Sequence, residues 1–155
     1  MERFKDILDK MDNRTYLFGA IFVVANKLQQ IGDEFDERIT LKQWRVLTAI
    51  AFCQGETGAS ISDIAEFTSS SGQNVKKIAV ILEKKKYVRI LQDGKDARYV
   101  RLSVTEQAKA LFEERKEKEE EFFQQLFKGM DDKTIQVMIE GYHQLFENME
   151  GMQSK

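Results

Sequence analysis

The segment SISDIAEFTSSSGQNVKKIAVILEKKKYVRILQDGKDARYVRLSV, residues Ser60–Val104, carries the pattern that decides the fold. Its first part holds two short runs of apolar residues at helical spacing, separated by the polar, turn-forming cluster Thr68–Gly72. Its second part alternates apolar and polar residues on both sides of Asp93 and Gly94, a strong turn signal between strands. Two short helices joined by a tight turn and followed by a β-hairpin form a winged helix-turn-helix. We therefore expect a mainly α fold with a small β-hairpin wing.

The second helix of this motif is expected to bury one stripe and to expose the opposite one. Apolar residues recur along it at the spacing of a single helical face, which is predicted to face the core. The outward side chains suit DNA, because Asn and Gln pair with adenine while Lys reaches guanine or phosphate. The predicted buried residues are Val75, Ile78, Ala79 and Leu82. The predicted DNA contacts of the two helices and their turn are Ser60, Ser70, Ser71, Gln73, Asn74, Lys76 and Lys77.

Two of these contacts have a second interpretation. Gln73 either reads a base or closes a capping box with Ser70, in which two side chains satisfy free backbone N–H groups at a helix start. Ser60 either contacts a phosphate or acts only as the N-cap of the first short helix. Asn74 is preferred over Gln73 as the predicted base contact.

Charge is unevenly distributed along the chain. The net charge of −2 and the isoelectric point of about 5.6 argue mildly against nucleic acid as a partner. From Lys76 to Arg101, however, nine basic residues stand against three acidic ones, a local excess of six positive charges. Lys95 belongs to this excess at the tip of the hairpin, and Lys76 and Lys77 are expected to hold phosphates rather than to read bases. A local basic excess of this kind predicts binding to duplex DNA.

The rest of the chain is expected to be helical and to belong to one domain, residues 1–155. The sequence contains no proline, so nothing locks φ inside a long helix. Gly32 and Gly129 are expected to end the helices that precede them. Thr40 is expected to start a helix through a capping box with Gln43. The predicted helices outside the motif cover about residues 12–32, 40–55, 105–128 and 131 onward.

Several short motifs resemble the multiple-antibiotic-resistance-regulator (MarR) family of bacterial transcription factors, in the family's order. The resemblance covers about residues 40–110, and the flanking helices match by layout. The family usually has glycine where this chain has Lys86 and Ala108. The helix before Lys86 is therefore expected to end without the left-handed conformation that glycine adopts easily. The matching residues are Leu41, Gln43, Trp44, Val46 and Leu47; Ser62, Ile64 and Ala65; Val75, Ile78 and Leu82–Lys85; and Asp96, Arg98, Val100, Leu102, Val104 and Thr105.

The resemblance implies a homodimer that binds a pseudo-palindromic operator in double-stranded DNA. Residues 36–104 would form the winged helix-turn-helix DNA-binding lobe, and residues 1–35 and 105–155 would form the helices that dimerise. The family places a wing arginine in the minor groove and orients the wing with an aspartate, here Arg98 and Asp96. We therefore expect a transcriptional regulator, specifically a ligand-responsive repressor that occludes its operator.

The resemblance also implies a small-molecule effector that binds between the dimer helices and the lobe. Tyr16, Phe18, Phe22 and Trp44 are the candidates to line such a site, although aromatic residues at helical spacing equally suit a plain core. The effector would release DNA by favouring a different separation of the two DNA-reading helices. The alternative is a winged-helix protein–protein interaction module without specific DNA binding, against which the basic wing argues.

Patterns typical of enzymes and metal sites are absent from the sequence. It has no Gly-rich phosphate loop, nucleophile elbow or metal-spaced Cys/His set, so neither catalysis nor a cofactor is expected. Cys53 is expected to be a packed thiol and not an oxidant sensor, and the single His143 has no second ligand nearby for a metal. The longest apolar stretch, Leu17–Ala25, is too short to cross a membrane. With no secretory signal at its start, the chain is expected to be cytoplasmic.

Overall fold

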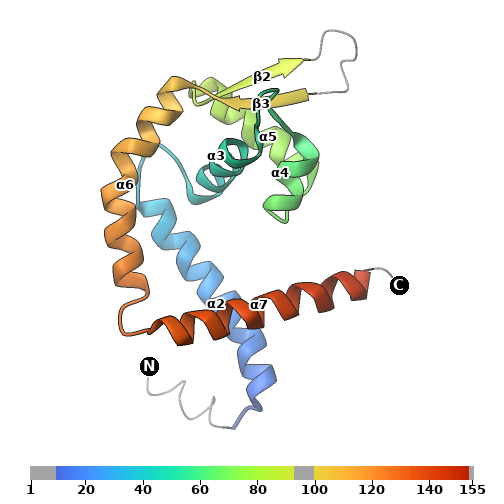
Figure 1. The fold of residues 1–155 in the computed structure, drawn as a ribbon, viewed down its shortest axis with the longest axis vertical. Coiled ribbons are helices and arrows are strands. Elements are labelled where there is room, and N and C mark those ends of the chain that lie inside the picture. The colour runs from blue at the N-terminus through green and yellow to red at the C-terminus, as the bar shows by residue number, and fades with distance from the viewer. Residues whose placement is uncertain (1–9, 93–99, 154–155) are drawn as a thin grey trace. The chain divides into compact units, whose positions relative to one another are not determined.

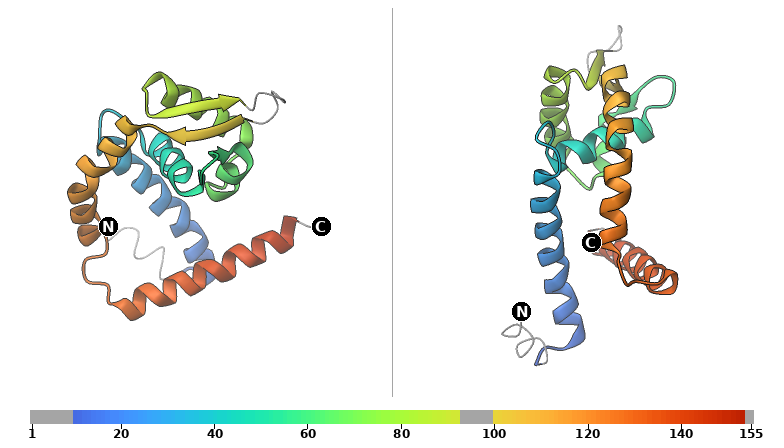
Figure 2. Two further views of the ribbon diagram at one scale, coloured as in Figure 1. Left: turned by 45° about the horizontal axis from the view of Figure 1, so that its top comes forward. Right: turned by 90° about the vertical axis from the view of Figure 1, so that its left-hand side faces the viewer.

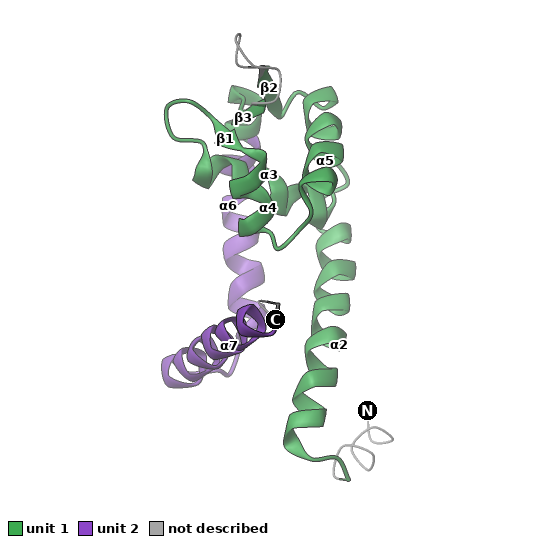
Figure 3. Ribbon diagram, turned by 90° about the vertical axis from the view of Figure 1, so that its right-hand side faces the viewer, with its two compact units in different colours: residues 1–110 green, residues 111–155 purple. Residues whose placement is uncertain are grey.

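The computed structural model describes residues 10–92 and 100–153, and the chain forms two compact units, Met1–Ala110 and Leu111–Lys155 (Figure 3). In chain order the elements are α2 (Asn13–Glu34), α3 (Leu41–Cys53), β1 (Ala59–Ser60), α4 (Ile61–Phe67), α5 (Gly72–Lys84), β2 (Val88–Gln92), β3 (Val100–Val104), α6 (Glu106–Leu126) and α7 (Asp132–Gln153). The predicted mainly α fold with a winged helix-turn-helix is confirmed. The division into a DNA-binding lobe and dimerising helices stays a prediction.

Both predicted hairpin strands are present, and a third short strand joins them. β2 pairs antiparallel with β3, and β1 pairs with the other edge of β3, which gives the order β1-β3-β2. Gly58, just before β1, has a φ of +89°, and a Cβ added there would lie 3.1 Å from the carbonyl oxygen of Leu102. Only glycine therefore lets the chain approach β3 this closely. The sequence did not predict β1, because two residues are too few to show the alternation typical of a strand.

Helices α3, α4 and α5 pack against this sheet and against one another (Figure 1). The predicted inward stripe of α5, Val75, Ile78, Ala79 and Leu82, is buried throughout. The core of the first unit also contains Ile39, Val46, Leu47, Ala49, Ile50, Ala59, Ile64, Tyr87, Val88, Leu102 and Ala108. Burial of each large aliphatic side chain contributes about 1.5–3 kcal/mol, so α5 is held to the sheet mainly by its apolar stripe.

The end of α5 is a Schellman motif, in which a left-handed residue lets two amides turn back to the last helical carbonyls. The Tyr87 amide donates to the Leu82 carbonyl at 2.9 Å, and the Lys86 amide donates to the Glu83 carbonyl at 2.8 Å. Lys86 takes the left-handed position with a φ of +63°. The expectation that this helix would end without the left-handed conformation is wrong, because Lys86 adopts it despite the steric cost of its Cβ.

Replacing Lys86 by glycine is expected to raise the free energy of unfolding by about 0.5–1 kcal/mol. The relief of left-handed strain, about 1–2 kcal/mol, exceeds the entropy that glycine adds to the unfolded chain. Lys84→Gly is the matched control, because it removes the same charge from a helical position and should cost about 1 kcal/mol. Urea denaturation at equal protein concentration measures both variants. A less stable Lys86→Gly protein would contradict this account.

Helix α2 begins where predicted but ends later. Asp12 caps it by accepting hydrogen bonds from the amides of Arg14 and Thr15. Gly32 lies inside the helix, and a Cβ added to it would come within 2.8 Å of the Leu41 side chain. The prediction that Gly32 ends the helix is wrong, because this glycine provides close contact with α3 rather than a turn. The helix extends away from the sheet, and no described residue of it is buried (Figure 2).

Asp33 joins the end of α2 to the start of α3. Its carboxylate accepts from the side-chain amide of Gln29 and from the backbone amide of Leu41, both at 2.8 Å. These two hydrogen bonds hold the pKa of Asp33 below its ordinary value, since they favour the charged carboxylate. Thr40 caps α3 as predicted, with its hydroxyl accepting from the Gln43 amide.

Helices α6 and α7 begin close to residues 105 and 131, as expected, and each has a side-chain cap. The Thr105 hydroxyl accepts from the Ala108 amide at 3.2 Å, and the Asp131 carboxylate accepts from the Thr134 amide at 2.8 Å. Gly129 lies between the two helices with a φ of +84°, so α6 ends as predicted.

Helix α7 carries many exposed apolar side chains. They are Val137, Met138, Ile139, Tyr142, Leu145, Phe146, Met149 and Met152. Despite this, none of the helices in the described ranges combines the length and the apolar character that a membrane span requires.

Candidate nucleic-acid interface

The outer face of α5 is the exposed stripe opposite its buried one. Because Val75 and Leu82 anchor the helix inward, the residues half a turn away point to solvent. The outer face consists of Gln73, Lys76, Lys77, Val80 and Lys84. It offers ammonium groups for phosphates and one amide for a base edge. The predicted contacts Gln73, Lys76 and Lys77 thus come together on one surface.

The start of α5 differs from the predicted capping box. Ser71 is the N-cap, and its hydroxyl accepts from the Asn74 backbone amide at 3.2 Å. Ser70 instead accepts from the Asn74 side-chain amide at 2.8 Å. The capping box between Ser70 and Gln73 is therefore wrong, because the helix starts one residue later than that box requires. Gln73 is left exposed on the outer face.

Asn74 is exposed, but Ser70 sets the orientation of its amide. One of the two side-chain N–H groups points to the serine hydroxyl. The second N–H and the carbonyl oxygen are the donor and acceptor that the N7 and N6 positions of adenine require. The base contact by Asn74 stays a prediction, with the amide orientation now defined.

Hydrogen bonds hold Ser60 and the turn after α4 in place. Ser60 is the N-cap of α4, with its hydroxyl accepting from the Asp63 amide at 3.1 Å, which confirms the capping interpretation. Its contact with phosphate stays a prediction. The Arg45 guanidinium donates to the Thr68 carbonyl at 3.3 Å and so ties the turn between α4 and α5 to α3.

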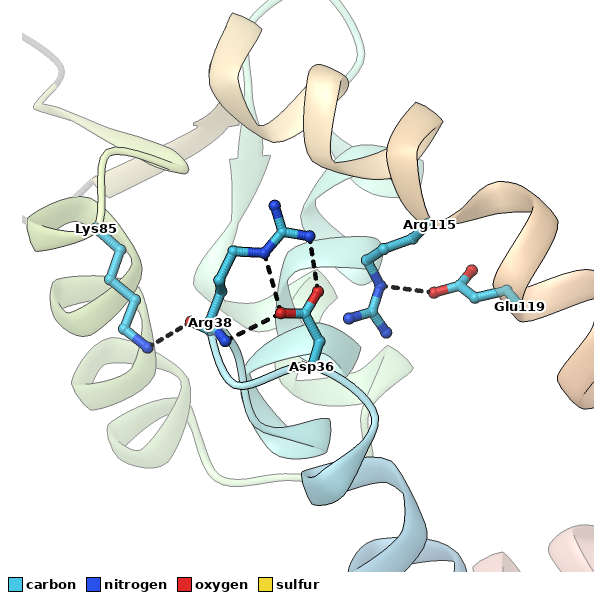
Figure 4. A network of polar contacts seen from close by, with 5 residues as sticks. All are labelled: Asp36, Arg38, Lys85, Arg115 and Glu119. Atoms are coloured by element: carbon cyan, nitrogen blue, oxygen red, sulfur yellow. Dashed lines mark hydrogen bonds and ion pairs between the residues drawn. The ribbon is translucent and has the colours of Figure 1, made fainter.

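Lys85 belongs to the basic run but not to the outer face. Its ammonium donates to the Arg38 carbonyl at 2.8 Å and to the Gln43 side-chain oxygen at 3.0 Å. Figure 4 shows the lysine reaching Arg38, whose guanidinium is paired with Asp36 at 2.9 Å. Lys85 therefore fixes the end of α5 to the segment between α2 and α3. Its second bond engages the Gln43 side chain, the group that the expected capping box with Thr40 would use.

Glu83 ties α5 to the wing. Its carboxylate accepts from the backbone amide of Ile90 at 3.1 Å. Ile90 lies in β2, an edge strand of the sheet, so the carboxylate satisfies an amide that no neighbouring strand pairs. The roles of Glu83 and Lys85 were missed from the sequence, which shows only two more charges in a charged run.

The wing carries a second basic surface. The register places Arg89 opposite Ser103 and Leu91 opposite Arg101, so these four residues share one face of the hairpin. Arg89 and Leu91 are exposed. The predicted contacts at the hairpin tip, Lys95, Asp96 and Arg98, lie outside the described residues.

The candidate effector residues lie on two helices. Tyr16, Phe18 and Phe22 are exposed on α2, and the rings of Phe18 and Phe22 meet edge to face with centroids 5.2 Å apart. Trp44 is half-buried on α3. Within a single chain, the three aromatic residues of α2 do not form a closed core.

Candidate metal ligands do not cluster within the described ranges, 10–92 and 100–153. These ranges contain no group of three or more His, Cys, Asp or Glu side chains placed to hold a metal ion. Cys53 is half-buried at the end of α3 as a free thiol.

The chain is similar in sequence to a curated protein. No family model matches the chain. The "transcriptional activatory protein BadR" of Rhodopseudomonas palustris is 27% identical over 106 residues. The matched region covers 67% of this chain and 61% of BadR, so the chain spans about three fifths of the length of this relative.

Solved structures match over almost the whole chain. A MarR/EmrR family regulator from Acinetobacter sp. ADP1 has a TM-score of 0.77 at 18% identity, covering 91% of this chain and 99% of the other. MepR of S. aureus, solved as a complex with DNA, has a TM-score of 0.76 at 22% identity, covering 90% and 99%. A MarR protein from Peptoclostridium difficile has a TM-score of 0.77 at 20% identity, covering 92% of each. The resemblance to the MarR family is thereby confirmed at the level of the fold.

Proposed function

We propose that this chain is a transcriptional regulator of the MarR type that binds a pseudo-palindromic operator as a homodimer. The observation that carries the proposal is the orientation of α5. Its buried stripe turns Gln73, Lys76 and Lys77 outward, while Glu83 and Lys85 fix it to β2 and to the segment before α3. Such fixed positioning is what reading DNA from the major groove requires. A similar protein, MepR, was solved as a complex with DNA.

The test of this proposal is selection of bound fragments from a pool of random duplex DNA. Two symmetric copies of α5 should enrich inverted half-sites about one helical turn apart. Recovery of such sites supports a sequence-specific regulator. A pool that stays random after repeated selection would contradict the proposal.

The homodimer is supported by exposed apolar surface on α2 and α7. Single chains seldom expose apolar patches of this extent unless a partner covers them. Phe18 and Phe22 on α2, and Tyr142 and Phe146 on α7, belong to this surface. The proposed partner is a second copy of the chain, because a two-fold symmetric operator is matched by a two-fold symmetric dimer.

Sedimentation is expected to show a species of twice the 18.1 kDa chain mass at micromolar concentration. Replacing Phe146 by glutamate should shift the protein toward the monomer, because a charge would be buried in the proposed interface. Gln144→Glu is the matched control, since it adds the same charge on the polar side of α7 and should leave the dimer intact. A parent protein that sediments as a monomer would refute the dimer.

We further propose that the regulator represses by occluding its operator and that a small amphipathic molecule releases it. The exposed ring pair Phe18 and Phe22, together with Tyr16 and Trp44, is the proposed lining of the effector site. An effector acts only through a difference in affinity between the DNA-bound and released states. BadR is named an activatory protein, so the sign of regulation is measured best with a reporter gene placed behind the selected operator.

One observation favours the second candidate, a winged-helix protein–protein interaction module. Phe52 and Phe67 are 78% and 59% exposed, and their rings stack with centroids 6.1 Å apart at the ends of α3 and α4. Exposed aromatic residues of this kind are frequent in protein interfaces. The random duplex selection separates the two candidates, because an interaction module would enrich no sequence.

A further inference from the structure

Val80 occupies the middle of the outer face of α5. It follows Lys77 by three residues and Gln73 by seven, and it precedes Lys84 by four, so the four side chains form one stripe. The Val80 side chain is 44% exposed. An apolar, branched residue therefore lies between two lysines on the surface that the proposed function turns toward DNA.

The stability of α5 does not explain a valine at this position. β-branched residues form helices less readily than Ala, Lys or Glu, which are the favoured residues at exposed helical positions. The inward stripe from Val75 to Leu82 is complete without Val80, which points away from it. What Val80 adds to the outer face is a pair of methyl groups in an otherwise polar stripe.

We infer that Val80 is a specificity-determining residue that reads the C5-methyl group of thymine in the major groove. Thymine alone among the four standard bases presents a methyl group there, and apolar side chains recognise it by direct contact. Lys77 and Lys84 lie on either side of Val80 along the helix, where contacts with phosphates fix its depth in the groove. The inference rests on the proposed function, since α5 must enter the groove for Val80 to touch a base.

Ile81, the next residue, provides a matched comparison. It is 40% exposed, nearly as much as Val80, and it is also apolar. It follows Asn74 by seven residues and so lies on the flank of the outer face rather than at its centre. Shortening Ile81 removes a similar amount of apolar surface from the same helix without touching the proposed thymine contact.

The experiment pairs deletion of methyl groups on the protein with deletion of the methyl group on DNA. The probe is the tightest duplex recovered from the random pool, with each thymine of a half-site replaced in turn by uracil, which lacks only that methyl. One uracil position should weaken binding of the parent about fourfold per half-site, the effect expected for one buried methyl group. Val80→Ala should bind the thymine duplex more weakly than the parent does, and it should bind the thymine and uracil duplexes equally.

The controls separate this contact from a general effect on the helix. Ile81→Ala should keep the fourfold preference for thymine over uracil. Lys77→Ala should weaken binding to both duplexes by the same factor and make the salt dependence shallower by about 0.9 per phosphate.

Failure of the inference and failure of the proposed function give different results. If no duplex is enriched, the proposed function falls and this inference falls with it. If a duplex is enriched but the parent tolerates uracil at every thymine, or Val80→Ala keeps the parent's preference for thymine, only the inference falls. A recovered site without thymine in its half-sites would overturn it equally.

Discussion

Replacing Lys76 and Lys77 together by alanine is expected to weaken binding to the selected duplex about a thousandfold at about 0.15 M salt. Both ammonium groups are exposed on the outer face of α5, and each is proposed to neutralise one phosphate. In a dimer the double variant loses four such contacts. Each neutralised phosphate contributes about 0.9 to the log–log slope of affinity against salt, so the slope should become shallower by about 3.6.

Fluorescence anisotropy with labelled duplex at several salt concentrations measures both quantities. The matched control is Lys116→Ala with Lys133→Ala, which removes the same total charge from exposed positions on α6 and α7. The control should change affinity and slope little, because the lost charges are not proposed to touch DNA. Equal slopes for the parent and the Lys76/Lys77 variant would show that these lysines do not contact phosphates.

Replacing Leu82 by alanine is expected to lower the free energy of unfolding by about 2–5 kcal/mol. Leu82 has no exposed surface, and it lies on the α5 face that packs against the sheet. The loss combines the transfer energy of the removed atoms with the cost of the cavity that they leave. A loss of this size would take much of the stability of an ordinary domain.

Ile81→Ala tests whether this cost reflects the orientation of α5. Ile81 is adjacent in sequence and 40% exposed, so its truncation should cost less than about 1 kcal/mol. Chemical denaturation at equal chain concentration keeps the contribution of dimerisation the same for both variants. Equal losses for the two variants would mean that α5 is rotated about its axis relative to the structure, and the outer face would then be wrong.

The fold was largely predictable because it depends on local patterns. The inward stripe of α5 and the alternation in β2 and β3 are visible within a few residues of sequence. The capping residue Thr40 was predicted for the same reason, since a cap bonds to an amide only two or three residues ahead.

The sequence predictions were wrong where a tertiary contact determines the local backbone conformation. Gly32 follows a helical run and resembles a stop, but its missing side chain makes room for Leu41. Lys86 holds a left-handed conformation that its residue type disfavours. The hydroxyl of Thr105 donates to the Lys86 carbonyl at 2.6 Å and helps to hold it there, from 19 residues further along the chain.

The outward side chains of the candidate site were predictable, but the hydrogen bonds that hold α5 in place were not. Gln73, Lys76 and Lys77 are placed outward by the same periodicity that buries Val75. Lys85, in contrast, bonds to Gln43 across 42 residues of sequence, and no local pattern separates it from a lysine that faces DNA. Which of Ser70 and Ser71 caps α5 depends on a shift of one residue, and the sequence offers both hydroxyls.

The central claim is that α5 reads DNA sequence, and the most direct test is the ratio of two affinities. One is measured on the selected duplex and the other on a scrambled duplex of the same length and composition, both at about 0.15 M salt. We expect the selected duplex to bind at least about a thousandfold more tightly, and both affinities to fall as salt rises. Equal affinities for the two duplexes, or an affinity that does not change with salt, would contradict the claim.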